Sequence, residues 1–330
     1  MGINMIIEIS KLAEICIPSL INAGISENDA LVVFNHLLDE ELLGKHSHGF
    51  IRMPSILNVA KSFFSPKSVV VENHGLFAYR YLFQNTLGLT AAYESTIAAC
   101  KMAKENGLSL ISAIGYKGTT GALGYYGRII AEEGYVGIIS CSSEFAVAPW
   151  GGKEAILGTN PLAIAIPNGD MPIICDFATA AMTYGDLMLA VKEGRKVPYG
   201  VVLDSDGKES QDPDDANNGC QLPMAGHKGY ALGLALEVLS GLFIGAKAGK
   251  DAVKSSDGIL FFVVKPDTFV SGDQFSSNLN SLINEIKSSA LAADSKGIRI
   301  PGESSLKEIR KGRESGLCDI PESVYKDLLQ

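Results

Sequence analysis

The hydrophobic pattern near the N-terminus has a helical period. Apolar residues recur every three or four positions, which predicts two amphipathic helices in succession. The first spans roughly Lys11 to Asn22 and is closed by Gly24. The second follows Ser26, an expected N-cap with Asp29 at the capping-box position, and continues to Gly44.

Further along the chain the pattern alternates between helices and short apolar runs. A third helix is predicted at 86–106, and further helical patterns occupy 276–292 and 304–316. Short apolar runs bounded by Gly, Pro or Asn predict strands at 108–114, 135–140, 161–167, 172–178 and 259–264. Such runs between helices favour a sheet covered on both faces, in a mixed α/β or α+β architecture.

Two other segments have a distinctive composition. Residues 204–221 are polar and rich in turn formers, as expected of a surface loop that can close over a site. Residues 230–246 are strongly apolar but carry Glu237 at their centre and are shorter than the ~20 residues that a membrane span needs. We therefore expect a helix buried in protein there.

Composition excludes several classes of protein. The formal net charge of −9, without a dense block of Lys and Arg, argues against nucleic acid or an anionic membrane surface as a partner. The six cysteines are scattered without a C-x-x-C pair, which predicts buried thiols in a reducing cytosol rather than disulfides or a zinc site. The N-terminal sequence MGINMIIEISK lacks the features of a secretion signal, so a cytoplasmic protein is expected.

The stretch GKHSHGFIRMP, residues 44–54, concentrates candidate chemistry. His46 and His48 form H-x-H, but no further ligands lie nearby, so no metal site is predicted. His48 and Arg52 are four residues apart and would share one face of a helix. A histidine that supplies a proton and an arginine that holds a carboxylate are the groups that reduction of a 2-oxo acid requires. On residue types alone, a capped turn with a surface arginine is the favoured alternative.

A glycine recurs at every third position from Gly115 to Gly127. The pattern is not G-x-G-x-x-G and no acidic residue follows at the expected distance, so the Rossmann fingerprint is absent. A loop leading into a helix remains, in which small residues allow close approach of the backbone. Close packing and close approach of a ligand are both open.

Four polar residues lie within apolar or glycine-rich segments: Asn160, Asp176, Lys228 and Glu303. A buried polar group without a partner costs several kcal/mol, so each is expected to have a structural or a functional partner. The sequence pattern does not decide which.

Five segments together resemble the malate/L-lactate dehydrogenase type 2 family. They are SHGFIRMP (47–54), PWGGKEAILGTNPLAIAIP (149–167), CDFATAAMTYG (175–185), GHKGYALGLALEVLSG (226–241) and RIPGE (299–303). The resemblance implies a non-Rossmann NAD(P)-binding fold and a homodimer whose site draws on both subunits. We expect an N-terminal helical region, 1–70, packed with C-terminal helices in 300–330, and a mixed-sheet NAD(P)-binding and catalytic region, 71–299.

The resemblance also implies roles for individual residues. His48 would be the proton donor and acceptor, and Asp176 would orient it. Substrate contacts would come from Ser47, Arg52, Thr159, Asn160 and Lys228. Cofactor contacts would come from Ser143, Pro172, Ile173, Ile174, Cys175, Asp176, Phe177, Ala178, His227, Lys228, Gly302, Glu303 and Ser304.

The expected function is hydride transfer between NAD or NADP and C2 of a small 2-hydroxy or 2-oxo acid, of the malate, lactate or ureidoglycolate type, or of a cyclic imino acid. Two departures from the family pattern leave the substrate open. The family's N-x-N-H motif is replaced by YKGTT, so that its histidine falls on Gly118 or Thr119, and Cys141 to Ser143 stand where relatives often have T-N-S. The alternative is an inactive member that acts as a binding or scaffold protein.

Overall fold

A seven-stranded mixed sheet forms the centre of the computed structural model, which describes residues 4–252 and 257–329. Its strands, in spatial order, are β2 (Ser68–Asn73), β3 (Ala78–Gln84), β4 (Leu108–Ile114), β11 (Gly258–Val264), β5 (Val136–Cys141), β6 (Leu162–Ile166) and β7 (Ile173–Phe177). β3 and β4 are parallel, and the other neighbours are antiparallel. The predicted mixed α+β fold is confirmed.

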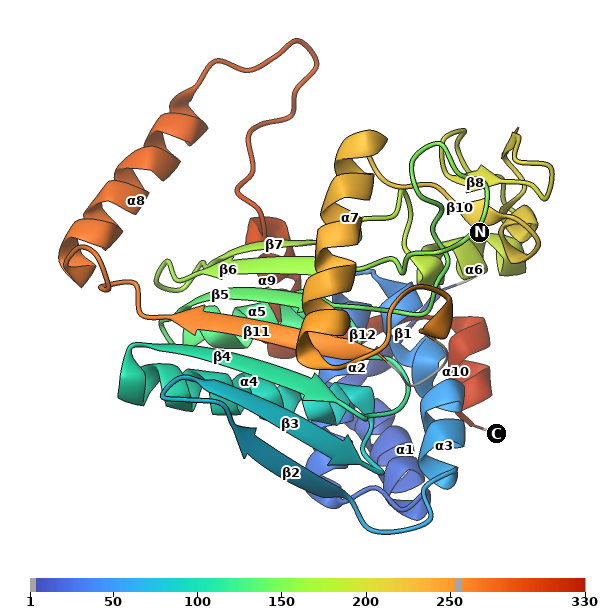
Figure 1. Ribbon diagram of the computed structural model, residues 1–330, viewed down its shortest axis with the longest axis horizontal. Helices are drawn as coiled ribbons and strands as arrows, with labels where there is room; N and C mark the ends of the chain where they lie inside the picture. The colour runs from blue at the N-terminus through green and yellow to red at the C-terminus, as the bar shows by residue number, and fades with distance from the viewer. Residues whose placement is uncertain (1–3, 253–256, 330) are drawn as a thin grey trace.

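Helices pack tightly on one face of this sheet. α4 (Gly88–Asn106) and α5 (Leu123–Glu132) cover it, and side chains such as Ile111, Ile139 and Phe261 are fully buried beneath them. α7 (His227–Ser240) crosses the opposite face (Figure 1). Ile138, which points to that face, is 40% exposed. The expectation of a sheet covered on both faces is therefore met only in part on the second face, where α7 crosses the strands but Ile138 remains exposed.

A second core joins the two ends of the chain. α1 (Ile9–Asn22), α2 (Glu27–Leu42), α3 (Met53–Lys61) and α10 (Glu322–Leu328) contribute to it. β1 (Asn4–Glu8) pairs antiparallel with β12 (Leu317–Pro321) beside these helices. The sequence-based boundaries at residues 70 and 299 stay a prediction, and residues 1–3, 253–256 and 330 of those regions lie outside the described residues.

The start of α2 shows how the sequence fixes a helix end. Ser26 Oγ accepts a hydrogen bond from Asp29 N at 3.2 Å, as predicted for an N-cap. The Asp29 carboxylate does not return to the Ser26 amide but accepts from Lys67 Nζ at 3.0 Å. Only half of the predicted capping box is therefore formed.

The predicted segments 204–221 and 230–246 differ from expectation. The first contains β9 (Glu209–Ser210), β10 (Cys220–Gln221) and the short 3₁₀ helix η3 (Pro213–Asn217), and with β8 (Val202–Leu203) its strands form a small sheet in the order β10-β8-β9. The second ends as an α-helix at Ser240, because Gly241 leaves helical geometry, and continues as η4 (Leu242–Ile244). α7 is also half-exposed rather than buried.

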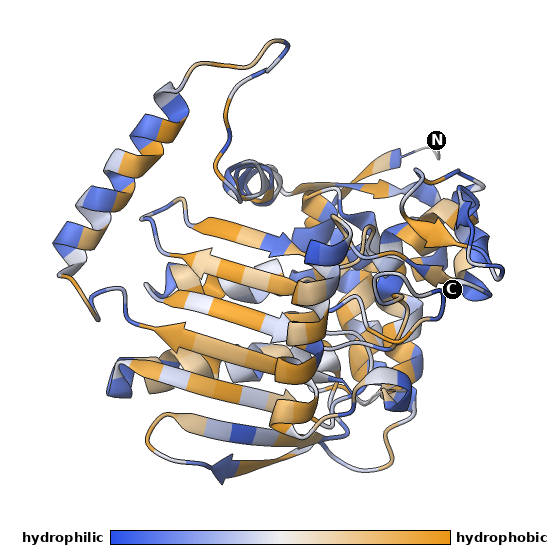
Figure 2. Ribbon diagram, turned by 45° about the horizontal axis from the view of Figure 1, so that its top comes forward, coloured by the Kyte–Doolittle hydropathy of each residue, from blue (hydrophilic) through white to orange (hydrophobic). Residues whose placement is uncertain are grey.

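α8 (Gly272–Ser288) stands away from the rest of the molecule, and none of its residues is buried (Figure 1). Figure 2 shows mixed polar and apolar residues along it, in contrast with the largely apolar central strands. The chain then returns to the body at α9 (Glu303–Ser315). No helix in the described part of the chain is long and apolar enough to cross a membrane.

Candidate active site

Two short 3₁₀ turns, η1 (His46–His48) and η2 (Phe50–Arg52), form the segment that carries the candidate chemistry. Ser47 Oγ lies 3.0 Å from His48 Nδ1, and Arg52 Nε donates to the Ser47 carbonyl at 2.7 Å. A Cβ on Gly185, at the start of α6 (Tyr184–Glu193), would lie 2.7 Å from Arg52 Nη2. The structure thus brings Ser47, His48 and Arg52 together beneath α6.

His48 lies in a desolvated and positively charged environment. Burial, and after it the charges of Arg52 and Lys45, lower the pKa of His48 to about 4. Burial also lowers the pKa of Arg52. His48 is neutral near pH 7 in the free protein, and an anion bound beside Arg52 would raise its pKa. The alternative of a surface arginine does not apply, because Arg52 is partly buried.

His46 has a different environment from His48. Its Nδ1 pairs with Glu41 Oε1, and the hydrogen bond to Glu41 raises the pKa of His46. Glu41 Oε2 also accepts from the Phe50 amide at 2.9 Å. His46 therefore helps to hold the turn.

Asp176 lies on β7 and faces Lys45 instead of His48. Its Oδ2 is 3.7 Å from Lys45 Nζ, too long for a strong hydrogen bond but within ion-pair range. Burial raises the pKa of Asp176. A hydrogen bond from the His48 ring to Asp176, by which Asp176 was expected to orient the histidine, is absent from the described residues, and Ser47 is the partner of the His48 ring.

Asp176 also lines a cavity of about 260 Å³ between α2, α5, β7 and the start of α9. Two of the predicted cofactor segments meet here, because Ile174 N donates to the Pro301 carbonyl at 3.1 Å. A Cβ on Gly302 would lie 3.0 Å from Ile174 N, so a glycine allows this approach. The cavity volume lies below the ~300–1,000 Å³ typical of sites for whole drug-sized ligands. The cavity therefore suits part of a dinucleotide.

The other predicted residues of these two segments have varied environments. Pro172 is buried, Phe177 is exposed, and Ile173, Cys175 and Ala178 are intermediate. Glu303 forms ion pairs with Lys307 and Lys287, and these hydrogen bonds lower its pKa to about 2. Ser304 is exposed, with Arg299 as its hydrogen-bond partner at 3.5 Å.

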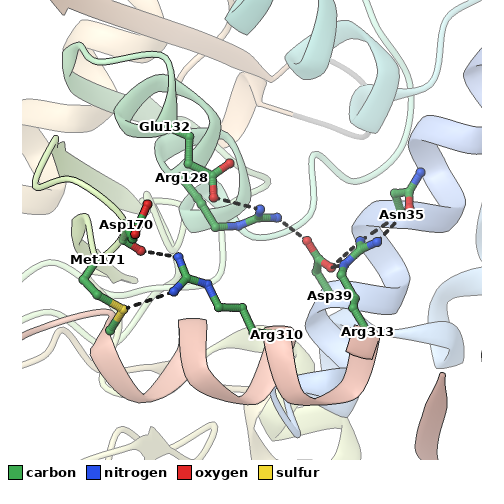
Figure 3. Close-up of polar contacts among 8 residues, drawn as sticks. All are labelled: Asn35, Asp39, Arg128, Glu132, Asp170, Met171, Arg310 and Arg313. Atoms are coloured by element: carbon green, nitrogen blue, oxygen red, sulfur yellow. Dashed lines mark hydrogen bonds and ion pairs between the residues drawn. The ribbon is translucent and has the colours of Figure 1, made fainter. Parts of the chain in front are cut away.

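A charged network anchors α9 against this cavity (Figure 3). Asp39 on α2 is 1% exposed and pairs with Arg128 on α5 and Arg313 on α9. Arg310 reaches from α9 to the carbonyl of Asp170, close to β7. The network joins the three helices that form the cavity wall.

Asn160, Thr159 and Ser143 belong to a second polar cluster. Asn160 is fully buried, and its Nδ2 donates to Glu237 Oε2 at 2.6 Å and to the Gly233 carbonyl at 3.0 Å. Ser143 Oγ accepts from Thr159 N at 2.9 Å. These contacts attach the loop before β6 to α7 and account for Glu237 within an apolar helix.

His227 and Lys228 are exposed at the start of α7. The His227 ring packs edge-on against Trp150, with centroids 6.3 Å apart. Among the described residues, no hydrogen bond or ion pair joins Lys228 to His48 or to the cavity. Within one chain, His227 and Lys228 thus form a surface separate from His48 and from the cavity.

Glycines of the repeat pack closely against neighbouring groups, and Gly124 also lines the cavity. A Cβ on Gly121 would lie 2.1 Å from His36 Nε2, and one on Gly124 would lie 2.8 Å from Asp176 Oδ2. Gly118, in the segment that replaces N-x-N-H, has a φ of 77° and packs against Val59. The backbone of Gly118 and Thr119 crosses the start of α4, where a Cβ on Gly88 would meet the Thr119 carbonyl at 2.5 Å.

Glu40 and Lys45 were missed by sequence reasoning. Glu40 is 2% exposed, and its Oε2 lies 3.9 Å from Lys45 Nζ in the same cavity. Burial raises the pKa of Glu40 to about 7. The sequence contains one indication of such a site. Three acidic residues, 39–41, lie near the C-terminus of a predicted helix, where the helix dipole disfavours negative charge.

Comparison with known proteins identifies the family. The sequence model of the malate/L-lactate dehydrogenase family matches residues 7–329, and the chain belongs to this family. The structure of sulfolactate dehydrogenase from Methanocaldococcus jannaschii superimposes with a TM-score of 0.87 at 30% identity, over 98% of this chain and 95% of that one. The predicted resemblance and fold are confirmed.

Two sequence relatives carry different cofactors in their names. Ureidoglycolate dehydrogenase (NAD(+)) from Escherichia coli is 29% identical, over 94% of this chain and 91% of the relative. (2R)-3-sulfolactate dehydrogenase (NADP(+)) from Chromohalobacter salexigens is also 29% identical, over 98% and 96%. The relatives are thus dehydrogenases of small hydroxy acids.

Proposed function

We propose that this protein is a nicotinamide-dependent dehydrogenase that interconverts a small 2-hydroxy acid and the corresponding 2-oxo acid, or acts on a cyclic imino acid. The observation that carries the proposal is the position of His48 beside Arg52, with Lys45 linking this segment to the cavity that Asp176 lines. The relatives named for sulfolactate and ureidoglycolate support this class of substrate.

Arg52 binds the substrate carboxylate. Its Nε is committed to the Ser47 carbonyl, so the terminal nitrogens of the guanidinium remain for the substrate. His48 exchanges the proton of the C2 hydroxyl. With Nδ1–H donating to Ser47 Oγ, Nε2 carries the lone pair that accepts this proton during oxidation.

The residues present fit a dinucleotide. Glu40 Oε2 is a buried acceptor without a hydrogen-bond partner among the described residues, and the Gly302 backbone lies close enough to Ile174 that a side chain would crowd it. Asp176, Ile174 and Gly302 would contact the cofactor, which supplies the hydride acceptor or donor when bound. The exposed pair His227 and Lys228, at the N-terminus of α7, provides a further contact for an anionic group.

A homodimer is part of the proposal. The half-exposed apolar face of the sheet and of α7 supports an interface with a second copy of the chain. Lys228 lies at the N-terminal end of α7. A partner subunit would bring the surface of His227 and Lys228 close to the remaining site residues. The six unpaired thiols support a reducing compartment, the cytosol.

Substrate profiling tests the function. The purified protein is mixed with NAD or NADP and each of malate, lactate, sulfolactate and ureidoglycolate, and formation of the reduced nicotinamide is followed by absorbance. A panel of 2-oxo acids and cyclic imino acids is tested in reverse with NADH or NADPH. We expect turnover with at least one substrate in both directions. Cofactor binding without turnover on any of them would instead favour the binding or scaffold protein.

A further inference from the structure

The Oε2 atom of Glu40 is an unusual atom to leave without a hydrogen-bond partner. It is 2% exposed on α2, and its Oε2 has no hydrogen-bond partner among the described residues. Lys45 Nζ, at 3.9 Å, is beyond hydrogen-bond distance. A buried polar atom without a partner is costly, so an atom in this position indicates a partner that binds from outside the chain.

The other charged groups of the cavity already have partners. Asp39 pairs with Arg128 and Arg313, and Lys45 lies slightly closer to Asp176, at 3.7 Å, than to Glu40, at 3.9 Å. The lining carries three carboxylates against the cations of Lys45 and Arg128, a net charge of about −1 when all are ionised. Glu40 is therefore the available acceptor, and the cavity favours a neutral hydrogen-bond donor over a further anion.

We propose that Glu40 accepts hydrogen bonds from the vicinal hydroxyls of a ribose of the nicotinamide cofactor. The inference rests on the proposed function and assigns Glu40 to cofactor recognition. The cavity volume suits a sugar, and the first turn of α9 lines the same space. A carboxylate matches a ribose diol because it offers two acceptor oxygens and no donor.

Either ribose of the cofactor could supply this diol. If the adenosine ribose binds here, a 2′-phosphate would remove one hydroxyl and add negative charge beside Glu40, so NADH would bind more tightly than NADPH. If the nicotinamide ribose binds here, NADH and NADPH would depend on Glu40 equally. Adenosine 5′-diphosphate and reduced nicotinamide mononucleotide each carry only one of the two riboses and separate the cases.

Calorimetric binding tests the proposal without reference to turnover. The proteins compared are the wild type, Glu40→Gln, Glu40→Met and the control Glu132→Gln. The control removes a carboxylate that pairs with the cavity residue Arg128 but is itself exposed and does not line the cavity. Glu40→Met keeps the side-chain volume and removes both acceptors, so it weakens NADH binding by about tenfold or more. Glu40→Gln loses less affinity for NADH, because its amide oxygen still accepts a hydrogen bond. One of the two mononucleotides loses affinity in parallel.

Binding of NADH also depends on pH, since the ionised carboxylate is the stronger acceptor. Burial raises the pKa of Glu40 to about 7, with Asp39 and Asp176 acting in the same direction and Lys45 and Arg128 opposing it. Wild-type affinity for NADH therefore rises from pH 6 to pH 8, whereas that of Glu40→Gln stays flat.

Equal NADH affinities in Glu40→Met and Glu132→Gln would overturn the role of Glu40 and leave the dehydrogenase proposal intact. Absence of any nicotinamide binding to the wild type, together with absence of turnover, would overturn both.

Discussion

His48 and His46 are two residues apart, yet their neighbours give them opposite properties. Burial and the nearby cations keep His48 neutral, whereas the Glu41 carboxylate favours the charged form of His46. As a neutral imidazole beside an arginine, the His48 side chain is suited to take a proton from a bound hydroxy acid. The substrate carboxylate would raise the pKa of His48 on binding and so help it to hold that proton.

A residue-scale prediction concerns Lys45. Its charge lowers the pKa of His48, so Lys45→Gln should raise that pKa by about 0.5 or more. NMR titration of the imidazole signals measures the change, with the His48 signal assigned from its loss in His48→Gln. Lys104→Gln, on α4, is the matched control and should leave the titration unchanged.

Glu40 should make folding stability depend on pH. Its folded-state pKa of about 7 lies above the ordinary value of 4.5, so its contribution is fully present below pH 4.5 and is lost as pH rises through 7. The loss is on the order of 3 kcal/mol. Glu40→Gln has no carboxylate to ionise. The Tm of Glu40→Gln minus that of the wild type should therefore be larger at pH 8 than at pH 5. Equal differences at both pH values would show that Glu40 does not titrate in this range.

At the scale of elements, α9 depends on α2 for its position. Asp39 is the shared partner of Arg128 and Arg313, and Arg310 attaches the same helix near β7 (Figure 3). Since Gly302 and Ser305 at the start of α9 line the cavity, this network positions part of the proposed cofactor site.

Asp39→Asn should destabilise the protein by about 3 kcal/mol, because it removes a buried charge and leaves two arginines without their partner. Urea denaturation measures the loss. Asp170→Asn provides the control, since Asp170 contributes its backbone carbonyl to Arg310 and that contact survives. A similar effect of both substitutions would contradict the central position of Asp39.

At the scale of the whole molecule, local patterns predicted much of the central sheet and little of how distant segments meet. The strands at 136–141, 162–166, 173–177 and 258–264 follow from apolar runs between turns. The pairing of β1 with β12 joins the two ends of the chain and has no local signal. Lys45 and Glu40 were missed for the same reason, since their significance depends on where β7 and α9 come to lie.

The exposed apolar face of α7 predicts self-association. Leu234, Val238 and Leu239 are each about two-fifths exposed on it. Light scattering at micromolar concentration should show a dimer, and Leu239→Lys should shift it toward monomer. Phe64→Lys, at a site 94% exposed between α3 and β2, should have no such effect. A fully active wild-type monomer would contradict the proposed composite site.

A comparison of His48→Gln with His46→Gln tests the role of His48 in proton transfer. Loss of a proton-transfer group costs about 10² to 10⁴-fold in rate. His48→Gln should therefore lower kcat for the best 2-hydroxy acid by at least a hundredfold while Kd for NADH and Tm stay near wild type. His46→Gln should retain most of the turnover. Near-normal turnover in His48→Gln, or equal losses in the two variants, would contradict the role of His48 as the proton acceptor.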